Sequence, residues 1–310
     1  MLSIIIPVYR NEESIATLLK TLENESIRSD QYFEAVFVVD GSPDRSYELL
    51  RDQLALVSFK AKLVLLTRNF GSFAAIRMGL SYAEGNFFAV MAADLQEPPE
   101  VVFEMGKILQ DESDPADVVI GVRNGRNDPF MSRIASTLFW GFYRKFVMKE
   151  IPEGGVDIFG CNKQFRDTLL SLDEQHSSLI AQIFWLGFRR KTVAYTRKER
   201  LHGKSAWTLQ KKISYLSDSI FSFTDLPIRL LIRVGMIGAL SIAILGFAVL
   251  LSKLLGFISV PGYTVIILAM SFIGALNLFS LGIVGSYAWR AYENTKNRPI
   301  AISLTVLKFK

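Results

Sequence analysis

The chain has 310 residues, of which 50% are hydrophobic and 21% are charged, with a net charge of +5. Its mean hydropathy of +0.27 is too high for an ordinary soluble enzyme of this length, so part of the chain is expected to lie in lipid. The single cysteine, Cys161, excludes an internal disulfide, and nothing indicates an oxidising compartment. The part of the chain outside lipid is therefore expected in the cytoplasm.

The first 122 residues alternate between short apolar runs and segments with helical periodicity. The expected strands are Leu2–Val8, Ala35–Val39, Leu63–Thr67, Asn86–Ala92 and Val118–Val122. Each run is nearly continuous, which is typical of parallel strands covered on both faces. Helical spacing follows in between, as at Ile15, Leu18, Leu19 and Leu22. This alternation predicts an α/β fold with a doubly wound, mostly parallel sheet and a ligand site at the carboxyl ends of its strands.

Polar residues follow three of these strands. The first strand leads into Pro7-Val8-Tyr9-Arg10-Asn11-Glu12-Glu13, and the second is followed by Asp40-Gly41-Ser42-Pro43-Asp44. Asp40 could accept hydrogen bonds from a nucleoside, although a plain turn and helix cap would use the same residues. After the fourth strand, the carboxylate of Asp94 and the carboxamide of Gln96 lie two residues apart. Such a pair can hold a divalent cation against a diphosphate.

Residues 206–229 form a separate amphipathic segment. Apolar side chains recur there at helical spacing, at Leu209, Ile213, Leu216, Ile220 and Phe223. A helix of this kind can lie in the headgroup layer of a membrane, where it would keep the catalytic part at the membrane surface. A packing helix in a soluble protein has the same pattern.

Residues 230–289 contain two apolar segments, roughly Leu231 to Leu255 and Tyr263 to Tyr287. About 20 helical residues cross a hydrocarbon core of ~30 Å, so both are expected to be transmembrane helices. A buried hairpin in a soluble protein would need helices far more apolar than globular helices usually are. Basic residues flank the pair at Arg229, Arg233, Arg290, Lys296 and Arg298. Both termini, including a tail at 290–310, are therefore expected in the cytoplasm.

Four motifs, read in order, resemble a known family. They are Pro7-Val8-Tyr9, Asp40-Gly41-Ser42-x-Asp44, Arg68-Asn69-Phe70-Gly71 and Asp94-Leu95-Gln96-x-Pro98, followed by the two C-terminal spans. This combination resembles the family 2 polyprenyl-phosphate glycosyltransferases, which include dolichol-phosphate mannosyltransferases and bactoprenol glucosyltransferases, and it covers essentially the whole chain. The resemblance implies a GT-A fold for residues 1–205, a nucleotide-diphosphate sugar donor, Mg²⁺ or Mn²⁺ as cofactor, and inversion at the anomeric carbon.

The resemblance also assigns roles to residues. The donor would be bound by Pro7, Tyr9, Glu12, Asp40 and Gln96. Asp94 and Gln96 would lie at the metal and the diphosphate, and Asp157 stands where the family has an acid proposed to assist catalysis near the acceptor.

Three residues depart from the family pattern. Val39 replaces the polar residue usual before the Asp-Gly-Ser turn, and Ala92 replaces the first acid of the Asp-x-Asp pattern. Phe159 stands where relatives often carry an arginine. Because Asp94 is left as a single acid, metal is expected to bind weakly without nucleotide.

An acceptor phosphate is already anionic at neutral pH, so it requires cations more than a strong base. The candidates follow the fifth strand or precede the membrane segment, and they are Arg123, Arg126, Arg133, Arg200 and Lys204. Arginine can hold phosphate through two parallel hydrogen bonds. The alternative is that these residues are solvated surface, as most residues in basic clusters are.

These observations predict a membrane-bound inverting glycosyltransferase that moves one sugar from a nucleotide-diphosphate sugar, with a UDP-sugar favoured, to undecaprenyl or another polyprenyl phosphate. The reaction would occur at the cytoplasmic face of the bacterial inner membrane and provide a lipid-linked sugar for cell-envelope glycans. One alternative is a polysaccharide synthase, against which stand the two spans and the lack of a Gln-x-x-Arg-Trp signature. The other is a non-catalytic or altered-specificity nucleotide-sugar-binding protein. Membrane lipid is an expected partner, nucleic acid is not, and analogy with relatives favours a homo-tetramer.

Overall fold

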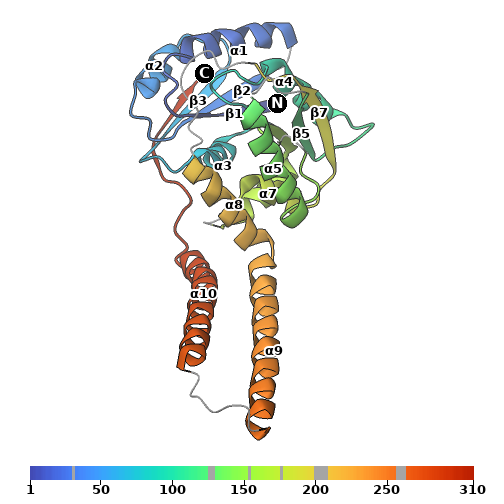
Figure 1. Ribbon diagram of the computed structural model, residues 1–310. Coiled ribbons are helices and arrows are strands. Elements are labelled where there is room, and N and C mark those ends of the chain that lie inside the picture. The colour runs from blue at the N-terminus through green and yellow to red at the C-terminus, as the bar shows by residue number, and fades with distance from the viewer. Residues whose placement is uncertain (30–31, 125–129, 153–154, 175–176, 199–208, 256–262) are drawn as a thin grey trace.

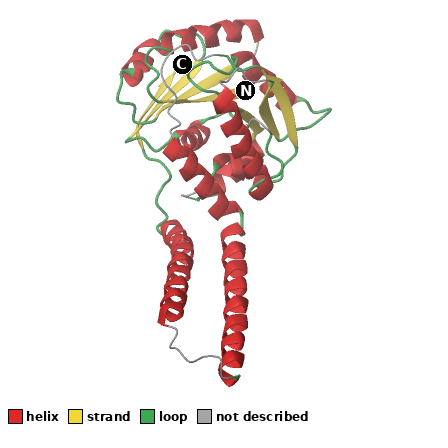
Figure 2. Cartoon of the chain, viewed as in Figure 1, coloured by secondary structure: helices red, strands yellow, loops and turns green. Residues whose placement is uncertain are grey.

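The structure is a computed structural model that describes residues 1–29, 32–124, 130–152, 155–174, 177–198, 209–255 and 263–310. Within these residues, one sheet lies between two layers of helices. Two long helices project from the molecule on the side of one of these layers (Figures 1 and 2). The α/β architecture expected from the sequence is confirmed.

The sheet has eight strands in the order β7-β5-β6-β4-β1-β2-β3-β8. The strands are β1 Leu2–Val8, β2 Phe33–Val39, β3 Lys60–Leu66, β4 Phe87–Val90, β5 Val118–Arg123, β6 Phe159–Asn162, β7 Arg190–Tyr195 and β8 Ser303–Phe309. β6 and β8 run antiparallel to their neighbours, and the other pairs are parallel. The mostly parallel sheet is thus as predicted. However, β6, β7 and β8 were not expected from the sequence, and β4 ends two residues before Ala92.

Alternate side chains of the central strands pack against different helix layers. Ile4 and Ile6 belong to a core cluster with α1 (Ile15–Ser29), α2 (Ser46–Gln53) and α4 (Pro99–Gln110). Ile5 faces the other layer, in a cluster that includes residues of α3, α5, α6 and α7. These helices are α3 Ser72–Tyr82, α5 Phe130–Phe146, α6 Lys163–Ser171 and α7 Leu179–Trp185. The sheet is therefore buried on both faces, which explains its continuous apolar runs.

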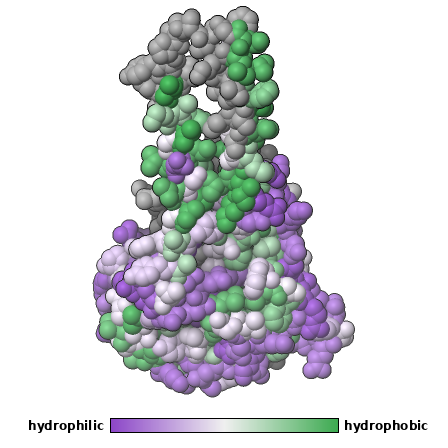
Figure 3. Space-filling view, turned by 90° about the horizontal axis from the view of Figure 1, so that it is seen from below, coloured by the Kyte–Doolittle hydropathy of each residue, from purple (hydrophilic) through white to green (hydrophobic). Residues whose placement is uncertain are grey.

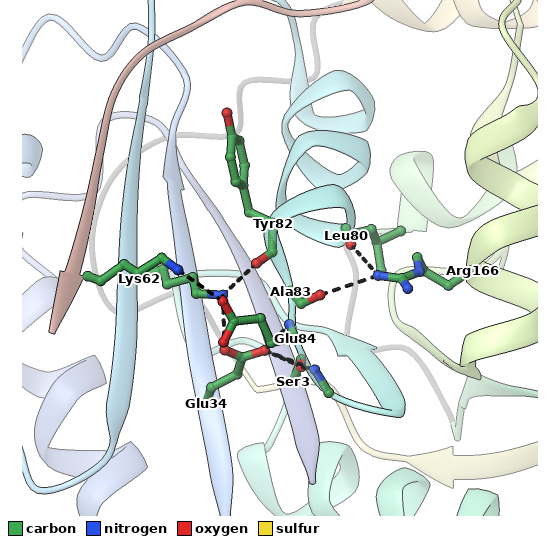
Figure 4. Close-up of polar contacts among 10 residues, drawn as sticks. Ser3, Glu34, Lys62, Leu80, Tyr82, Ala83, Glu84 and Arg166 are labelled. Atoms are coloured by element: carbon green, nitrogen blue, oxygen red, sulfur yellow. Dashed lines mark hydrogen bonds and ion pairs between the residues drawn. The ribbon is translucent and has the colours of Figure 1, made fainter. Parts of the chain in front are cut away.

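Polar contacts at the amino ends of β1, β2 and β3 connect these strands with one another and with the carboxyl end of β8 (Figure 4). Ser3 Oγ donates to Glu34 Oε1 over 2.6 Å, and Lys62 Nζ lies 3.5 Å from Glu34 Oε2 and 2.7 Å from Glu84 Oε1. Lys308 of β8 reaches the same Glu84 oxygen at 3.1 Å. Since Glu34 is 1% and Lys62 is 5% exposed, this pair is buried with its partners. The C-terminal strand is thus held to the sheet by an ion pair as well as by backbone pairing.

The long helices are α9, Leu226–Leu254, and α10, Tyr263–Thr295, which extend beyond the sheet domain (Figure 1). Hydrophobic residues gather at this end of the molecule, whereas polar residues cover much of the sheet domain (Figure 3). Within the described part of the chain, one segment is long and apolar enough to cross a membrane, Phe272–Thr295 of α10. The first of the two expected spans stays a prediction, although α9 exposes large apolar side chains such as Leu240 and Phe247.

Helix α8, Leu209–Phe223, connects the sheet domain to the projecting helices. Tyr215 and Leu216 pack against the core cluster beneath α3, while Ile213 is 61% exposed. Arg290 of α10 makes an ion pair with Asp218 at 2.8 Å, and its guanidinium lies 5.1 Å from the ring centroid of Phe221. α8 therefore packs on the sheet domain and also contacts α10.

Candidate active site

The loops after β1 and β2 are joined by reciprocal hydrogen bonds. The Arg10 amide donates to Ser42 Oγ over 2.8 Å, and the Glu12 amide donates to Asp44 over 3.1 Å. Glu12 Oε2 in turn accepts from the Arg45 amide over 3.0 Å. Burial opposes ionisation of Asp44, but hydrogen bonds from Ser42, Ser46 and Glu12 hold the pKa of its carboxyl below the usual value. Tyr9 and Glu12 therefore lie beside the Asp40–Asp44 turn, as expected from the parallel pairing of β1 and β2.

Asp40 is 2% exposed and supports a neighbouring loop. Its two carboxylate oxygens accept from the Phe70 amide over 2.7 Å and the Gly71 amide over 2.9 Å, just before α3. Gly41 has a φ of 56°, and a Cβ there would come within 2.3 Å of the Arg68 carbonyl carbon. The turn thus requires glycine. These contacts give Asp40 the structural role of holding the loop before α3, and its contact with a donor stays a prediction.

The turn after β4 presents Asp94 and Gln96 at the carboxyl edge of the sheet. The Gln96 amide donates to Asp94 Oδ1 over 3.2 Å. Leu95, between them, has a φ of 56°, a left-handed conformation that costs a residue with a side chain about 1–2 kcal/mol. The backbone therefore places the two predicted ligand side chains on one tight turn.

Asp157 is held by two residues from neighbouring strands. Arg123, at the end of β5, binds both of its carboxylate oxygens through Nε and Nη2. Tyr195, at the end of β7, donates its hydroxyl to Asp157 Oδ2 over 2.7 Å. Burial and the neighbouring Asp157 carboxylate raise the pKa of Tyr195, so the hydroxyl stays a donor at neutral pH. Arg123, predicted as a contact of the acceptor phosphate, thus has two of its donors on Asp157.

Glu97 and Arg197 lie between these groups. Glu97 is 1% exposed, and its Oε1 lies 3.4 Å from Arg197 Nε. Burial, followed by the nearby charge of Asp157, raises the pKa of Glu97 to about 7. Tyr195 contacts Asp157, and Arg197, two residues further on, contacts Glu97, so the turn after β4 and the Asp157 loop both lie beside the end of β7. The structure thus brings Asp94, Gln96, Arg123 and Asp157 to one edge.

Two residues on this edge offer oxygen donors to a divalent cation. Asp94 supplies a carboxylate and Gln96 an amide oxygen, but Ala92 offers no side-chain oxygen. Arg197 Nη2 already donates to Gln96 Oε1 over 2.8 Å. Among the residues that the structure describes, no group of three or more His, Cys, Asp and Glu could hold a metal. Two hard oxygen donors in one turn fit Mg²⁺ or Mn²⁺ only when phosphate oxygens complete the coordination shell.

The other predicted residues are placed as follows. Pro7 lies in β1 opposite Val38 of β2, and the departures Val39 and Phe159 are buried in β2 and β6. Arg126, Arg200 and Lys204 lie outside the described residues, as does the side chain of Arg133. The acceptor roles of these four residues therefore stay predictions.

Sequence reasoning missed Tyr195 and Glu97 as residues of this edge, and it considered Arg197 only as one of a basic cluster that could contact phosphate. Tyr195 ends β7 and Arg197 follows it, and because this strand was not predicted, their nearness to β5 could not be inferred. Glu97 follows Gln96 directly, and an acid that is adjacent to a candidate ligand and precedes two prolines was the available signal. Arg197 also belongs to a visible basic cluster before the membrane segment.

Known relatives match nearly the whole chain, and a family model matches its first part. Residues 3–171 match the family described as Glycosyl transferase family 2. CsbB of Bacillus subtilis (strain 168), which is named as a glycosyltransferase, is 34% identical over 299 residues, or 96% of this chain and 90% of the relative. An undecaprenyl-phosphate 4-deoxy-4-formamido-L-arabinose transferase of Edwardsiella ictaluri is 31% identical over 96% of this chain and 91% of its own. A prophage bactoprenol glucosyl transferase homolog of Escherichia coli (strain K12) is 28% identical over 99% of both chains.

Proposed function

This chain belongs to glycosyl transferase family 2 and is a glycosyltransferase with a GT-A-like fold, and on that premise we propose that it transfers one sugar, with inversion, to a polyprenyl phosphate. The donor is a nucleotide-diphosphate sugar, with a UDP-sugar favoured. Relatives named as transferases for undecaprenyl phosphate and bactoprenol support this acceptor, because they match over more than nine tenths of their own length. The product is a lipid-linked sugar for cell-envelope glycans.

The observation that carries the proposal is the arrangement around Asp157. Arg123 and Tyr195 fix its carboxylate, and the Asp94–Glu97 turn lies within electrostatic reach of it. In this fold, ligands bind at the carboxyl ends of parallel strands, where these residues meet. An anionic donor and an anionic acceptor would approach each other here, where Arg123 and Arg197 supply positive charge.

Asp94 and Gln96 are the proposed holders of a divalent cation, Mg²⁺ or Mn²⁺. Bound with the donor, the cation neutralises the charge that develops on the leaving nucleotide diphosphate. The acceptor phosphate is anionic at neutral pH, so Asp157 is not required as a strong base. Its proposed role is to orient Arg123, whose remaining N–H donors can bind acceptor phosphate. Arg126, Arg133, Arg200 and Lys204 are proposed as further acceptor cations.

The proposed membrane arrangement has two crossings. The chain leaves the sheet domain after α8 and returns to the same sheet as β8, so any membrane between them is crossed an even number of times. If Phe272–Thr295 of α10 spans the bilayer, α9 has to cross it as well. This supports a multi-pass protein of the bacterial inner membrane with the catalytic domain and both termini in the cytoplasm. A homo-tetramer is proposed by analogy with relatives.

The test is a transfer assay with the full chain in detergent. Purified protein is incubated with undecaprenyl phosphate, Mg²⁺ or Mn²⁺, and a panel of UDP- and GDP-sugars, and lipid-linked product is measured. We expect product with at least one UDP-sugar and none when the lipid phosphate is replaced by undecaprenol. Nucleotide binding without transfer to lipid phosphate from any donor would contradict the proposal.

A further inference from the structure

The segment that follows β7 crosses the Asp94–Glu97 turn and is fastened to it. The Lys198 amide donates to the Gln96 carbonyl over 2.8 Å, and Gln96 Nε2 lies 3.5 Å from the Lys198 carbonyl. The preceding residue, Arg197, donates from its side-chain Nη2 to Gln96 Oε1 over 2.8 Å. The side-chain oxygen of Gln96 therefore accepts from Arg197, and its side-chain nitrogen donates to the Lys198 carbonyl.

Arg197 donates to the Gln96 side-chain oxygen, which is the atom that a cation would use as a ligand. Gln96 offers one side-chain oxygen, and a charge-assisted hydrogen bond from a guanidinium is stronger than one from a neutral donor. A divalent cation beside that guanidinium would also meet like-charge repulsion. As long as Arg197 holds this oxygen, Asp94 is the remaining proposed protein ligand on the turn.

The Glu97 carboxylate offers a second acceptor to the Arg197 guanidinium. Its Oε1 lies 3.4 Å from Arg197 Nε, and its Oε2 is buried without a hydrogen-bond partner among the described residues. A buried carboxylate oxygen without a partner is costly, and Arg and carboxylate favour bidentate pairing. If Nη2 leaves Gln96, Glu97 Oε2 can accept it, so Arg197 exchanges one hydrogen bond for another and stays on the turn.

We propose that Arg197 is a positioning residue of the donor site, which holds the Gln96 amide oxygen in the empty site and moves onto Glu97 when a nucleotide-diphosphate sugar binds with its divalent cation. The inference rests on the proposed function, because Gln96 is taken as a cation ligand. It assigns the weak metal binding that is expected without nucleotide to competition by Arg197 as well as to Ala92. The phosphates of the donor offset the repulsion that a cation alone would meet.

The experiment measures Mn²⁺ binding to the full chain in detergent without nucleotide, from the free Mn²⁺ signal in electron paramagnetic resonance. Arg197→Ala is compared with Lys198→Ala, which removes one positive charge from the next residue while the backbone contacts with Gln96 remain. We expect Arg197→Ala to tighten Mn²⁺ binding about tenfold, because it removes the Arg197 donor from the Gln96 oxygen, and Lys198→Ala to change it less than about twofold. Equal tightening in both variants, or none in Arg197→Ala, would overturn the inference.

Two further variants separate competition from other causes. Gln96→Ala removes the contested oxygen, so adding Arg197→Ala to it should tighten Mn²⁺ binding by less than about twofold, as expected from the loss of one positive charge. If the double variant binds Mn²⁺ more than about twofold more tightly than Gln96→Ala, the inference is wrong. Calorimetry with UDP and GDP is run on the same samples. A lack of nucleotide binding by every form would count against the proposed function, while the Mn²⁺ comparison would still decide the role of Arg197.

Discussion

At the residue scale, Asp94 follows β4 without a second acid at the position of Ala92. Asp94, Gln96 and Asp157 were predicted from short motifs, and the structure places them on one edge of the sheet. The contacts that fix them come from Arg123, Tyr195 and Arg197, at the ends of β5 and β7. Motif spacing identified the acids because they are local in sequence. It could not identify their partners, which depend on which strands become neighbours.

Asp94→Asn is the direct test of this assignment. The amide keeps the size of the side chain but removes the negative charge, so the proposed cation loses its carboxylate ligand. We expect the initial rate of sugar transfer to undecaprenyl phosphate to fall by at least about a hundredfold. Circular dichroism should show unchanged folding, and Glu104→Gln, an exposed carboxyl of α4, serves as the control. Retention of more than half of the activity would remove Asp94 from the site.

At the element scale, β8 is the least expected part of the fold. Residues 303–309 were treated as part of a cytoplasmic tail, yet they pair with β3 along the edge of the sheet. An open edge strand leaves backbone groups without partners, and β8 covers that edge of β3. The alternating pattern of Ser303–Phe309 is compatible with a strand, but its partner lies more than 230 residues away in sequence, as in the pairing of Val64 with Val306.

The ion pair between β8 and Glu84 predicts a pH dependence of stability. Hydrogen bonds from Lys62 and then Lys308 lower the pKa of Glu84 from 4.5 to about 2. A carboxyl whose folded pKa is depressed contributes stability above its unfolded pKa and loses it as pH falls toward the folded value. Glu84→Gln should therefore lower the melting temperature at pH 6, with the difference from wild type closing between about pH 4.5 and 2. A difference that stays constant over thermal scans in this range, as expected for Glu104→Gln, would contradict this.

At the scale of the whole molecule, β8 constrains how the chain can sit in a membrane. Residues before α9 and after α10 belong to one folded unit, so in the proposed arrangement both ends of the helical pair lie on the same side of the membrane. Hydropathy and flanking charges led to the same arrangement from the sequence. The tertiary structure adds a reason that does not depend on hydropathy, because a strand cannot pair with a sheet across a bilayer.

Cysteine labelling can test this topology in cells. Leu255, after α9, is 62% exposed, and Ile302, before β8, is 49% exposed. Cys161 is fully buried, and burial raises the pKa of its thiol, so the native cysteine should stay unreactive. An impermeant maleimide should label Leu255→Cys in spheroplasts and Ile302→Cys only in inverted vesicles. Labelling of both from the same side would exclude two crossings by α9 and α10.

The sequence by itself determined the αβ alternation, the family, the acids at the strand ends and the apolar C-terminal segments. These features depend on local periodicity and on motifs of a few residues, which can be read along the chain. The tertiary structure decided that β7 lies beside β5, so that Tyr195 meets Asp157 and Arg197 meets Gln96, and that β8 returns to β3. Such pairings join residues up to about 250 positions apart, and they are selected by backbone hydrogen bonding and burial of the whole sheet, which no local pattern encodes.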